Sequence, residues 1–182
     1  MRKIAVTAFL TIVMTGFAAA QIPTSGNVFF GYSYYNSSIS GQRTSLNGWE
    51  GSVEGKVLPF IGIVGDFSGY DGSQNFTTCT TPILDCVTFH NNFTEHNYLF
   101  GPRASVSVGK IRPFAELLVG AGHIHVNGGG SDTSFATAVG GGIDYKLLRV
   151  LAWRFQADYI HTTLFNVAQN NVRLTTGIVL RF

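Results

Sequence analysis

The sequence predicts an all-β protein, an eight-stranded antiparallel up-and-down transmembrane β-barrel preceded by a cleavable signal peptide. Three observations support this fold class: the alternation of apolar and polar residues over 172–182, a secretory signal at the amino terminus, and a length of 182 residues. A transmembrane β-strand needs about 9 to 11 residues whose side chains alternately face lipid and lumen. After the signal is removed, roughly 160 residues remain, enough for eight such strands but not for sixteen.

The amino terminus has the features of a secretory signal. Met1-Arg2-Lys3 precedes an apolar run from Ile4 to Phe17, and Ala18-Ala19-Ala20 provides a small-residue cleavage site. We therefore expect residues 1–20 to be removed and residues 21–182 to form one barrel domain. An uncleaved membrane anchor is the alternative, although the apolar run is shorter than the roughly 20 residues that a spanning helix needs.

Composition excludes several other classes. Charged residues make up 12% of the chain, aromatic residues 13%, and there are 22 glycines. No apolar stretch after the signal is long enough for a transmembrane helix. The net charge of +2 comes without a cluster of basic residues, so the sequence has no electrostatic feature typical of nucleic-acid binding.

Alternation along the chain identifies the strands, and the connections between them alternate in length. Short connections follow the second strand (Leu58-Pro59), the fourth (109–111) and the sixth (148–150), whereas the others are long and rich in Asn, Gly and Ser. Short periplasmic turns and longer extracellular loops are typical of outer-membrane barrels. The expected strands lie near residues 27–35, 46–57, 60–70, 96–108, 112–125, 135–147, 151–161 and 172–182.

Each expected strand separates apolar from charged residues between its two faces. The first and fourth strands collect aromatic residues on one face, for example Phe30 and Phe100, and the fifth places small residues beside Glu116 on the other. In the remaining strands, neighbours on opposite faces are Trp49 and Glu50, Phe67 and Asp66, Tyr145 and Asp144, Trp153 and Arg154, and Leu174 and Arg173.

The charged face holds acids and bases in equal number, and its other positions are mostly the small residues Gly, Ala and Ser. Buried charges are tolerated when they are paired and hydrogen bonded, so we expect a closed ion-pair network in a narrow lumen. Its expected members are Glu50, Glu54, Lys56, Asp66, Arg103, Glu116, Asp144, Lys146, Arg154, Asp158, Arg173 and Arg181.

A soluble, lipocalin-like barrel would show the same alternation with its apolar face turned inward. The interior of an eight-stranded barrel is just wide enough for side chains to fill, and the many rings of the apolar face would overfill it. The membrane interpretation therefore requires rings such as Phe100, Trp153 and Phe155 to point outward. It also requires charged residues such as Arg103 and Asp158 to point toward the axis.

These features resemble the small outer-membrane β-barrels of Gram-negative bacteria, of the kind represented by OmpX and the transmembrane domain of OmpA. The resemblance covers nearly all of the mature chain, and its most specific element is the last strand, in which Leu174, Ile178, Leu180 and Phe182 match the outward positions. In that family the terminal aromatic residue is the signal read by the barrel-assembly machinery. The resemblance therefore implies that Phe182 is the assembly signal and that this machinery is a partner.

Cys79 and Cys86 lie in the longest expected loop, residues 71–95. In an exported protein, two cysteines in one polar loop favour a disulfide. The bond would protect a long loop or present a fixed surface outside the cell, and the sequence favours protection. His90 and His96 are nearby, but no recognised zinc spacing is present, so we predict no metal site and no cofactor.

The remaining histidines raise the possibility of an enzyme. Some eight-stranded barrels modify lipid A, and the deacylase type has a His-x-Ser pair followed by a glutamate. Here His161 is followed by Thr163 at the serine position, and no glutamate occurs after Glu116. The sequence therefore favours His123, His125 and His161 as residues of the membrane interface.

We thus expect a monomeric, non-catalytic protein of the bacterial outer membrane with a structural or surface-interaction role through its extracellular loops. Its expected partners are outer-membrane lipids, lipopolysaccharide, the barrel-assembly machinery and an extracellular ligand. The alternatives are a small porin-like channel, a lipid A-modifying enzyme and the soluble barrel.

Overall fold

The computed structural model describes residues 25–39, 42–80, 85–127, 130–164 and 167–182. For residues 38–39, 42–43, 74–80, 85–91 and 167 it describes the backbone only. The expected signal peptide, residues 1–20, lies outside the described residues. Among those described, no helix is long and apolar enough to cross a membrane.

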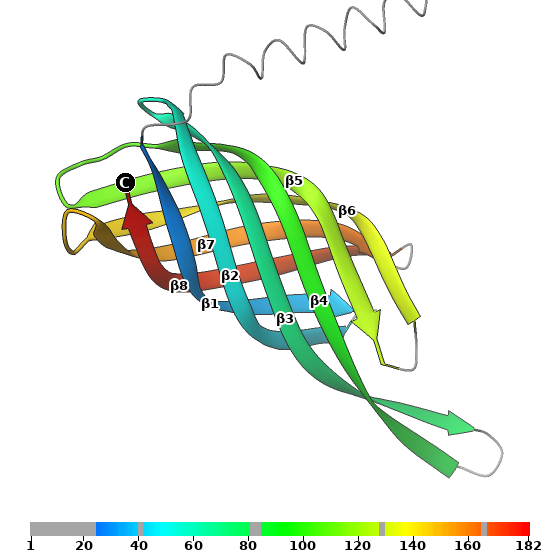
Figure 1. Cartoon of the computed structure of the whole chain (residues 1–182). Helices are drawn as coiled ribbons and strands as arrows, with labels where there is room; N and C mark the ends of the chain where they lie inside the picture. Colours follow the sequence, from blue (N-terminus) through cyan, green and yellow to red (C-terminus); the bar gives the residue numbers. More distant parts are fainter. Residues whose placement is uncertain (1–24, 40–41, 81–84, 128–129, 165–166) are drawn as a thin grey trace, which may run out of the picture.

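In the described part of the chain, eight antiparallel strands form a closed barrel in which every strand pairs with its neighbours in the sequence and β1 pairs with β8 (Figure 1). This is the predicted fold class. The strands are β1 (Gly26–Ile39), β2 (Gln42–Leu58), β3 (Ile61–Thr80), β4 (Asp85–Ser105), β5 (Ile111–Val126), β6 (Gly130–Lys146), β7 (Leu151–Leu164) and β8 (Val167–Arg181).

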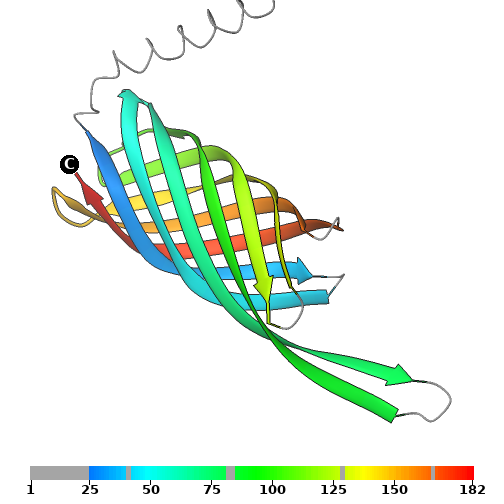
Figure 2. The same ribbon diagram turned by 45° about the vertical axis from the view of Figure 1, so that its right-hand side comes forward.

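The strands are longer than the sequence predicts, and the difference is largest in β3 and β4. Residues 71–95, expected to be a loop, continue these two strands as a hairpin whose paired residues reach Thr80 and Asp85. β3 leaves β2 after Asp71, and β4 joins β5 only from Phe93. The hairpin therefore extends well beyond the barrel, at the end opposite the carboxyl terminus (Figures 1 and 2).

The expected strand ends were wrong here because a two-stranded ribbon outside a barrel has no apolar face to bury. Alternation therefore stops near residue 70, while Thr, Phe and Val continue to favour extended backbone. The opposite end of the barrel has the short connections that the sequence predicts. In the connection between β4 and β5, Gly109 has a φ of 63°, which a residue without a Cβ adopts easily.

Candidate functional site

The outward face of the barrel is a belt of exposed apolar side chains. Phe100, Trp153 and Phe155 are 61%, 40% and 63% exposed. Arg103 and Asp158, on the other face of the same two strands, are 0% and 3% exposed. The rings therefore face the surroundings and the charges face the axis, which is the arrangement that hydrocarbon around a barrel requires.

Polar side chains border this belt toward the projecting hairpin. His123 Nδ1 lies 2.7 Å from Thr133 Oγ1, and His161 Nδ1 lies 2.8 Å from Asn170 Oδ1. Both histidines bond to neutral groups on neighbouring strands, and neither has a described carboxylate partner. In the described part of the chain, no group of three or more His, Cys, Asp or Glu residues is placed to hold a metal ion.

The interior contains two connected ionic clusters. In the first, the guanidinium of Arg173 on β8 lies among three carboxylates from β2, β3 and β7. Its Nη1 is 2.8 Å from Asp66 Oδ1, its Nη2 is 2.8 Å from Asp158 Oδ2, and its Nε is 3.2 Å from Glu50 Oε2. All four side chains are buried, so one base balances three acids.

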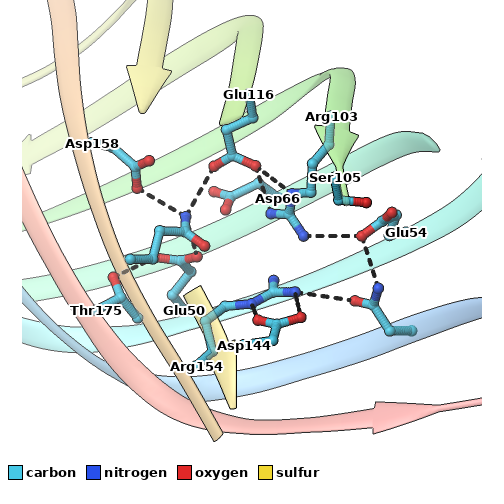
Figure 3. A network of polar contacts seen from close by, with 12 residues as sticks. Glu50, Glu54, Asp66, Arg103, Ser105, Glu116, Asp144, Arg154, Asp158 and Thr175 are labelled. Carbon is cyan, nitrogen blue, oxygen red and sulfur yellow. Dashed lines mark hydrogen bonds and ion pairs between the residues drawn. The ribbon is translucent and has the colours of Figure 1, made fainter. Parts of the chain in front are cut away.

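The amide of Gln156 connects this cluster to the second one. Its Nε2 lies 3.1 Å from Glu50 Oε1 and 3.0 Å from Glu116 Oε1. Arg103 Nε then donates to Glu116 Oε2 at 2.7 Å, and Arg103 Nη1 reaches Glu54 Oε2 at 3.3 Å. Figure 3 shows Arg103 lying between these two carboxylates.

Arg154 and Asp144, which are directly paired on β7 and β6, complete the second cluster. Arg154 Nε donates to Asp144 Oδ1 at 2.7 Å (Figure 3). The guanidinium carbon of Arg154 also lies 4.9 Å from the ring centroid of Phe29 and 4.6 Å from that of Phe114. Two aromatic faces therefore stabilise a cation that water does not reach.

Most of the sequence-predicted interior residues lie in these clusters, and Lys146 does not. Lys146 is the last residue of β6, and its side chain is exposed because it extends past the rim of the barrel, where no opposite wall covers it. Lys56 and Arg181 lie at the same rim and are partly buried. Lys56 Nζ is 3.5 Å from Glu54 Oε1, and Arg181 Nη2 is 3.3 Å from Asp144 Oδ2.

Sequence reasoning missed two interior charges. Arg112 Nη2 donates to Glu54 Oε1 at 2.8 Å, and the same alternation that places Glu116 inside could have identified it. Glu95 was assigned to a loop, but it is buried in β4, where Asn97 Nδ2 lies 3.4 Å from its Oε1.

A second interior feature that the sequence did not reveal is an apolar layer toward the hairpin end. The stacked rings of Tyr35 and Tyr70, whose centroids are 4.5 Å apart, pack in it, and Asn171 Nδ2 donates to Tyr35 Oη at 2.7 Å. Its buried members also include Leu46, Val64, Phe93, Leu99, Leu118, Ile124, Ala136, Ala138, Ile160 and Leu164. Together the apolar and ionic layers fill the described interior.

The other predicted site residues lie at the two ends of the molecule. Cys79 and Cys86 are directly opposite each other in the hairpin, but their side chains are outside the described ones, so the disulfide stays a prediction. Phe182 is 65% exposed on the outward face at the turn end, the end of the barrel that has the short connections. Its backbone forms a reciprocal pair of hydrogen bonds with Gly26, at 3.0 and 3.1 Å.

Comparisons with known proteins show which class of protein has this fold. No protein-family model matches the chain, and no curated protein matches it either. Among solved structures, Neisserial surface protein A (NspA) is similar with a TM-score of 0.68 and 13% identity, over 86% of this chain and 97% of that chain. The outer membrane protein OprG from Pseudomonas aeruginosa gives a TM-score of 0.58 and 8% identity, over 89% and 97%.

Ail, the attachment invasion locus protein of Yersinia pestis, is similar in its complex with the heparin analogue sucrose octasulfate. The TM-score is 0.57 and the identity 16%, over 87% of this chain and 98% of that chain. These likenesses are of fold. The chain has the fold of the small outer-membrane β-barrels, as the sequence predicts.

Proposed function

We propose that this chain is a non-catalytic protein of the bacterial outer membrane, exported by its signal peptide, whose hairpin end interacts with surfaces outside the cell. The observation that carries the proposal is the combination of an exposed apolar belt with a filled interior. A barrel of this kind is stable in lipid and leaves its outer end free for recognition.

The filled interior argues against the channel alternative. A conducting pore needs a continuous path for water, but the stacked rings of Tyr35 and Tyr70 and the side chain of Leu118 are fully buried in the apolar layer. Below them, the ionic clusters connect different strands across the interior, as in the ion pair of Arg173 Nη1 with Asp66 Oδ1 at 2.8 Å. We therefore expect negligible single-channel conductance.

The hairpin is the surface that we assign to interaction. A polar pocket of about 540 Å³ lies at its base, between β2, β3 and β4, and Asn47, Asp71 and Asn92 are among its lining residues. Apart from the buried Glu95, the sequence at this end of the barrel has the acids Asp71, Asp85 and Asp132 against a single arginine, Arg43. A neutral or cationic ligand suits this charge better than the sulfated sugar bound by Ail, and we expect contact with lipopolysaccharide to need divalent cations.

Two further parts of the proposal concern assembly. We propose that the exposed ring of Phe182, at the end of β8, is recognised by the barrel-assembly machinery. We also propose that the barrel is a monomer, since β1 and β8 close the sheet and leave no unpaired edge within the barrel wall.

The test uses the full chain expressed in a Gram-negative host. We expect an outer-membrane fraction whose band migrates differently before and after boiling, and no stable conductance in planar bilayers. A soluble periplasmic protein without that shift would contradict the location, and a steady conductance would contradict the closed interior.

A hairpin-shortened variant tests the surface role. Ser73 and Asn92 are paired residues, so replacing 74–91 by Asn-Gly closes the ribbon with a two-residue turn that favours a hairpin. The variant should keep the heat-dependent band shift, while cells that express it should attach to cultured epithelial cells less than cells with the intact protein. Equal attachment would contradict a role for the hairpin.

A further inference from the structure

The turn end of the barrel contains a pocket whose function the ion-pair network does not explain. It has a volume of about 330 Å³ and opens at the rim where the chain enters β1 and leaves β8. Three bases from three different strands line it: Lys56 on β2, Arg112 on β5 and Arg181 on β8. No Asp or Glu is among its described lining residues.

The acids behind the pocket do not balance these bases. Glu54 accepts from Arg112 at 2.8 Å and also faces Lys56 at 3.5 Å and Arg103 at 3.3 Å. One carboxylate therefore faces three bases, and only Arg103 has a second acid, Glu116.

The same excess occurs on the other side of the pocket. Asp144 is shared between Arg154 and Arg181, and the Nε of Arg181 is buried with no hydrogen-bond partner among the described residues. Among the described residues, the carboxylate of Phe182 forms no ion pair with the pocket's bases. Counting side chains alone, five bases face three acids at this end, an excess of two positive charges, which the carboxylate of Phe182 in the pocket lining reduces to one.

A neutral hydroxyl lies where two of these bases, Lys56 and Arg112, converge. Ser105 Oγ accepts from Lys56 Nζ at 2.6 Å and from Arg112 Nη2 at 2.8 Å. Two cations thus direct donors at an oxygen that carries no formal charge. An anionic oxygen in the adjoining pocket would make stronger, charge-assisted bonds with the same donors.

The rim around the pocket is apolar. Val57, Leu58 and Phe60, in and beside the turn between β2 and β3, are exposed hydrophobic residues. At the proposed membrane location, this apolar rim places the mouth of the barrel near the lipid headgroups. The bases therefore lie where phosphate groups are concentrated.

We propose that this pocket binds a phosphate group through Lys56, Arg112 and Arg181. A phosphate matches both the excess charge and the forked donors of two guanidinium groups. The phosphate is carried either by a phospholipid of the inner leaflet or by a free phosphate in solution. The lipid source depends on the proposed membrane location, whereas binding of free phosphate does not.

The first experiment tests free phosphate on the full mature chain in uncharged maltoside micelles. Inorganic phosphate is titrated at constant ionic strength against chloride and acetate, while the amide NMR signals of Gly26, Lys56, Ser105 and Arg112 are followed. We expect saturable shifts with phosphate. In the Lys56→Gln variant the apparent affinity should fall about tenfold, because one charge-assisted bond is lost.

The matched control is Lys146→Gln, which removes the same charge from an exposed lysine at the same end, outside the pocket. It should leave the affinity unchanged. If Lys56→Gln loses the heat-dependent band shift of the folded barrel, Arg181→Gln replaces it with the same expectation.

The second experiment tests the lipid source in nanodiscs. Discs with phosphatidylglycerol are compared with discs made of an uncharged galactolipid that lacks phosphate. Shifts of the same amides in the phosphatidylglycerol discs, reduced by Lys56→Gln, identify the lipid as a source. The proposal is overturned if neither experiment gives a saturable response, if acetate acts like phosphate, or if Lys146→Gln weakens binding as much as Lys56→Gln. Failure here leaves the surface role of the hairpin untouched, since the two lie at opposite ends of the barrel.

Discussion

Arg173 on β8 binds Asp66 on β3 across the interior through two parallel contacts, Nη1 to Oδ1 at 2.8 Å and Nη2 to Oδ2 at 3.2 Å. The forked geometry of a guanidinium and a carboxylate makes such a pair strong and specific. Because Asp158 and Glu50 lie against the same guanidinium, this one side chain connects β8 with β2, β3 and β7.

Replacing Arg173 should therefore destabilise the barrel strongly. In Arg173→Met three buried carboxylates lose their shared base, and breaking a buried ion pair from one side costs about 3–5 kcal/mol. We expect this loss in the free energy of unfolding, measured by urea titration in lipid vesicles. Arg149→Met, in the exposed turn between β6 and β7, is the control and should change the free energy by less than about 0.5 kcal/mol. Equal stability of the two variants would contradict the central role of Arg173.

Closure of the barrel depends on a close approach of β1 and β8 at Gly31 and Gly177, which are paired residues. A Cβ at Gly177 would overlap the Cα of Gly31 and the carbonyl oxygen of Phe30. Gly177→Ala should therefore reduce the fraction of chains that show the heat-dependent band shift after refolding. Gly65→Ala is the matched control, because a Cβ there meets only the ring of Phe67 at 3.7 Å or more. A normal folded fraction for Gly177→Ala would show that the seam tolerates a side chain.

The two tryptophans of the chain, Trp49 and Trp153, are both on the outward face, 45% and 40% exposed. Trp153 Nε1 donates to Thr176 Oγ1 at 2.8 Å. In vesicles, we expect the fluorescence of both tryptophans to be quenched by lipids brominated on their acyl chains. The variants Trp49→Phe and Trp153→Phe allow the remaining tryptophan to be measured alone. Quenching by aqueous iodide but not by brominated lipid would contradict the membrane location.

The register of the hairpin places Cys79 opposite Cys86, and directly paired residues of antiparallel strands have Cα atoms within the range that a disulfide spans. We expect the exported protein to be lighter by the mass of two hydrogens than the reduced chain. Cys79→Ser should make the hairpin more sensitive to protease on intact cells, while leaving the unfolding of the barrel unchanged. Alkylation of both cysteines without a reductant would show that the thiols are free.

Much of the wall could be predicted from the sequence. The number of strands and the inward or outward direction of residues such as Arg103 and Phe155 follow from alternation, which is a local property with a period of two residues. The same rule was wrong for Lys146, because alternation gives the side of the sheet but not the height at which the wall ends. It also gave no length for β3 and β4 beyond the apolar belt, where neither face of the ribbon is buried.

The contents of the interior were harder to predict. Alternation collected the charged residues on one face, but it did not show that Tyr35, Tyr70 and Leu118 form a separate apolar layer above them. Nor did it show that Lys56, Arg112 and Arg181 converge on one pocket. These residues come from distant parts of the chain, and their heights depend on how far each strand is shifted against the next.

By itself the sequence determined which side chains face outward and which face the axis, since each strand fixes this through its own alternation. Only the tertiary structure decided which charges meet. Arg173 and Asp66 are separated by 107 residues, and their contact depends on the tilt and stagger of all the strands between them. Those two quantities are set when the sheet closes on itself, and no local pattern records them.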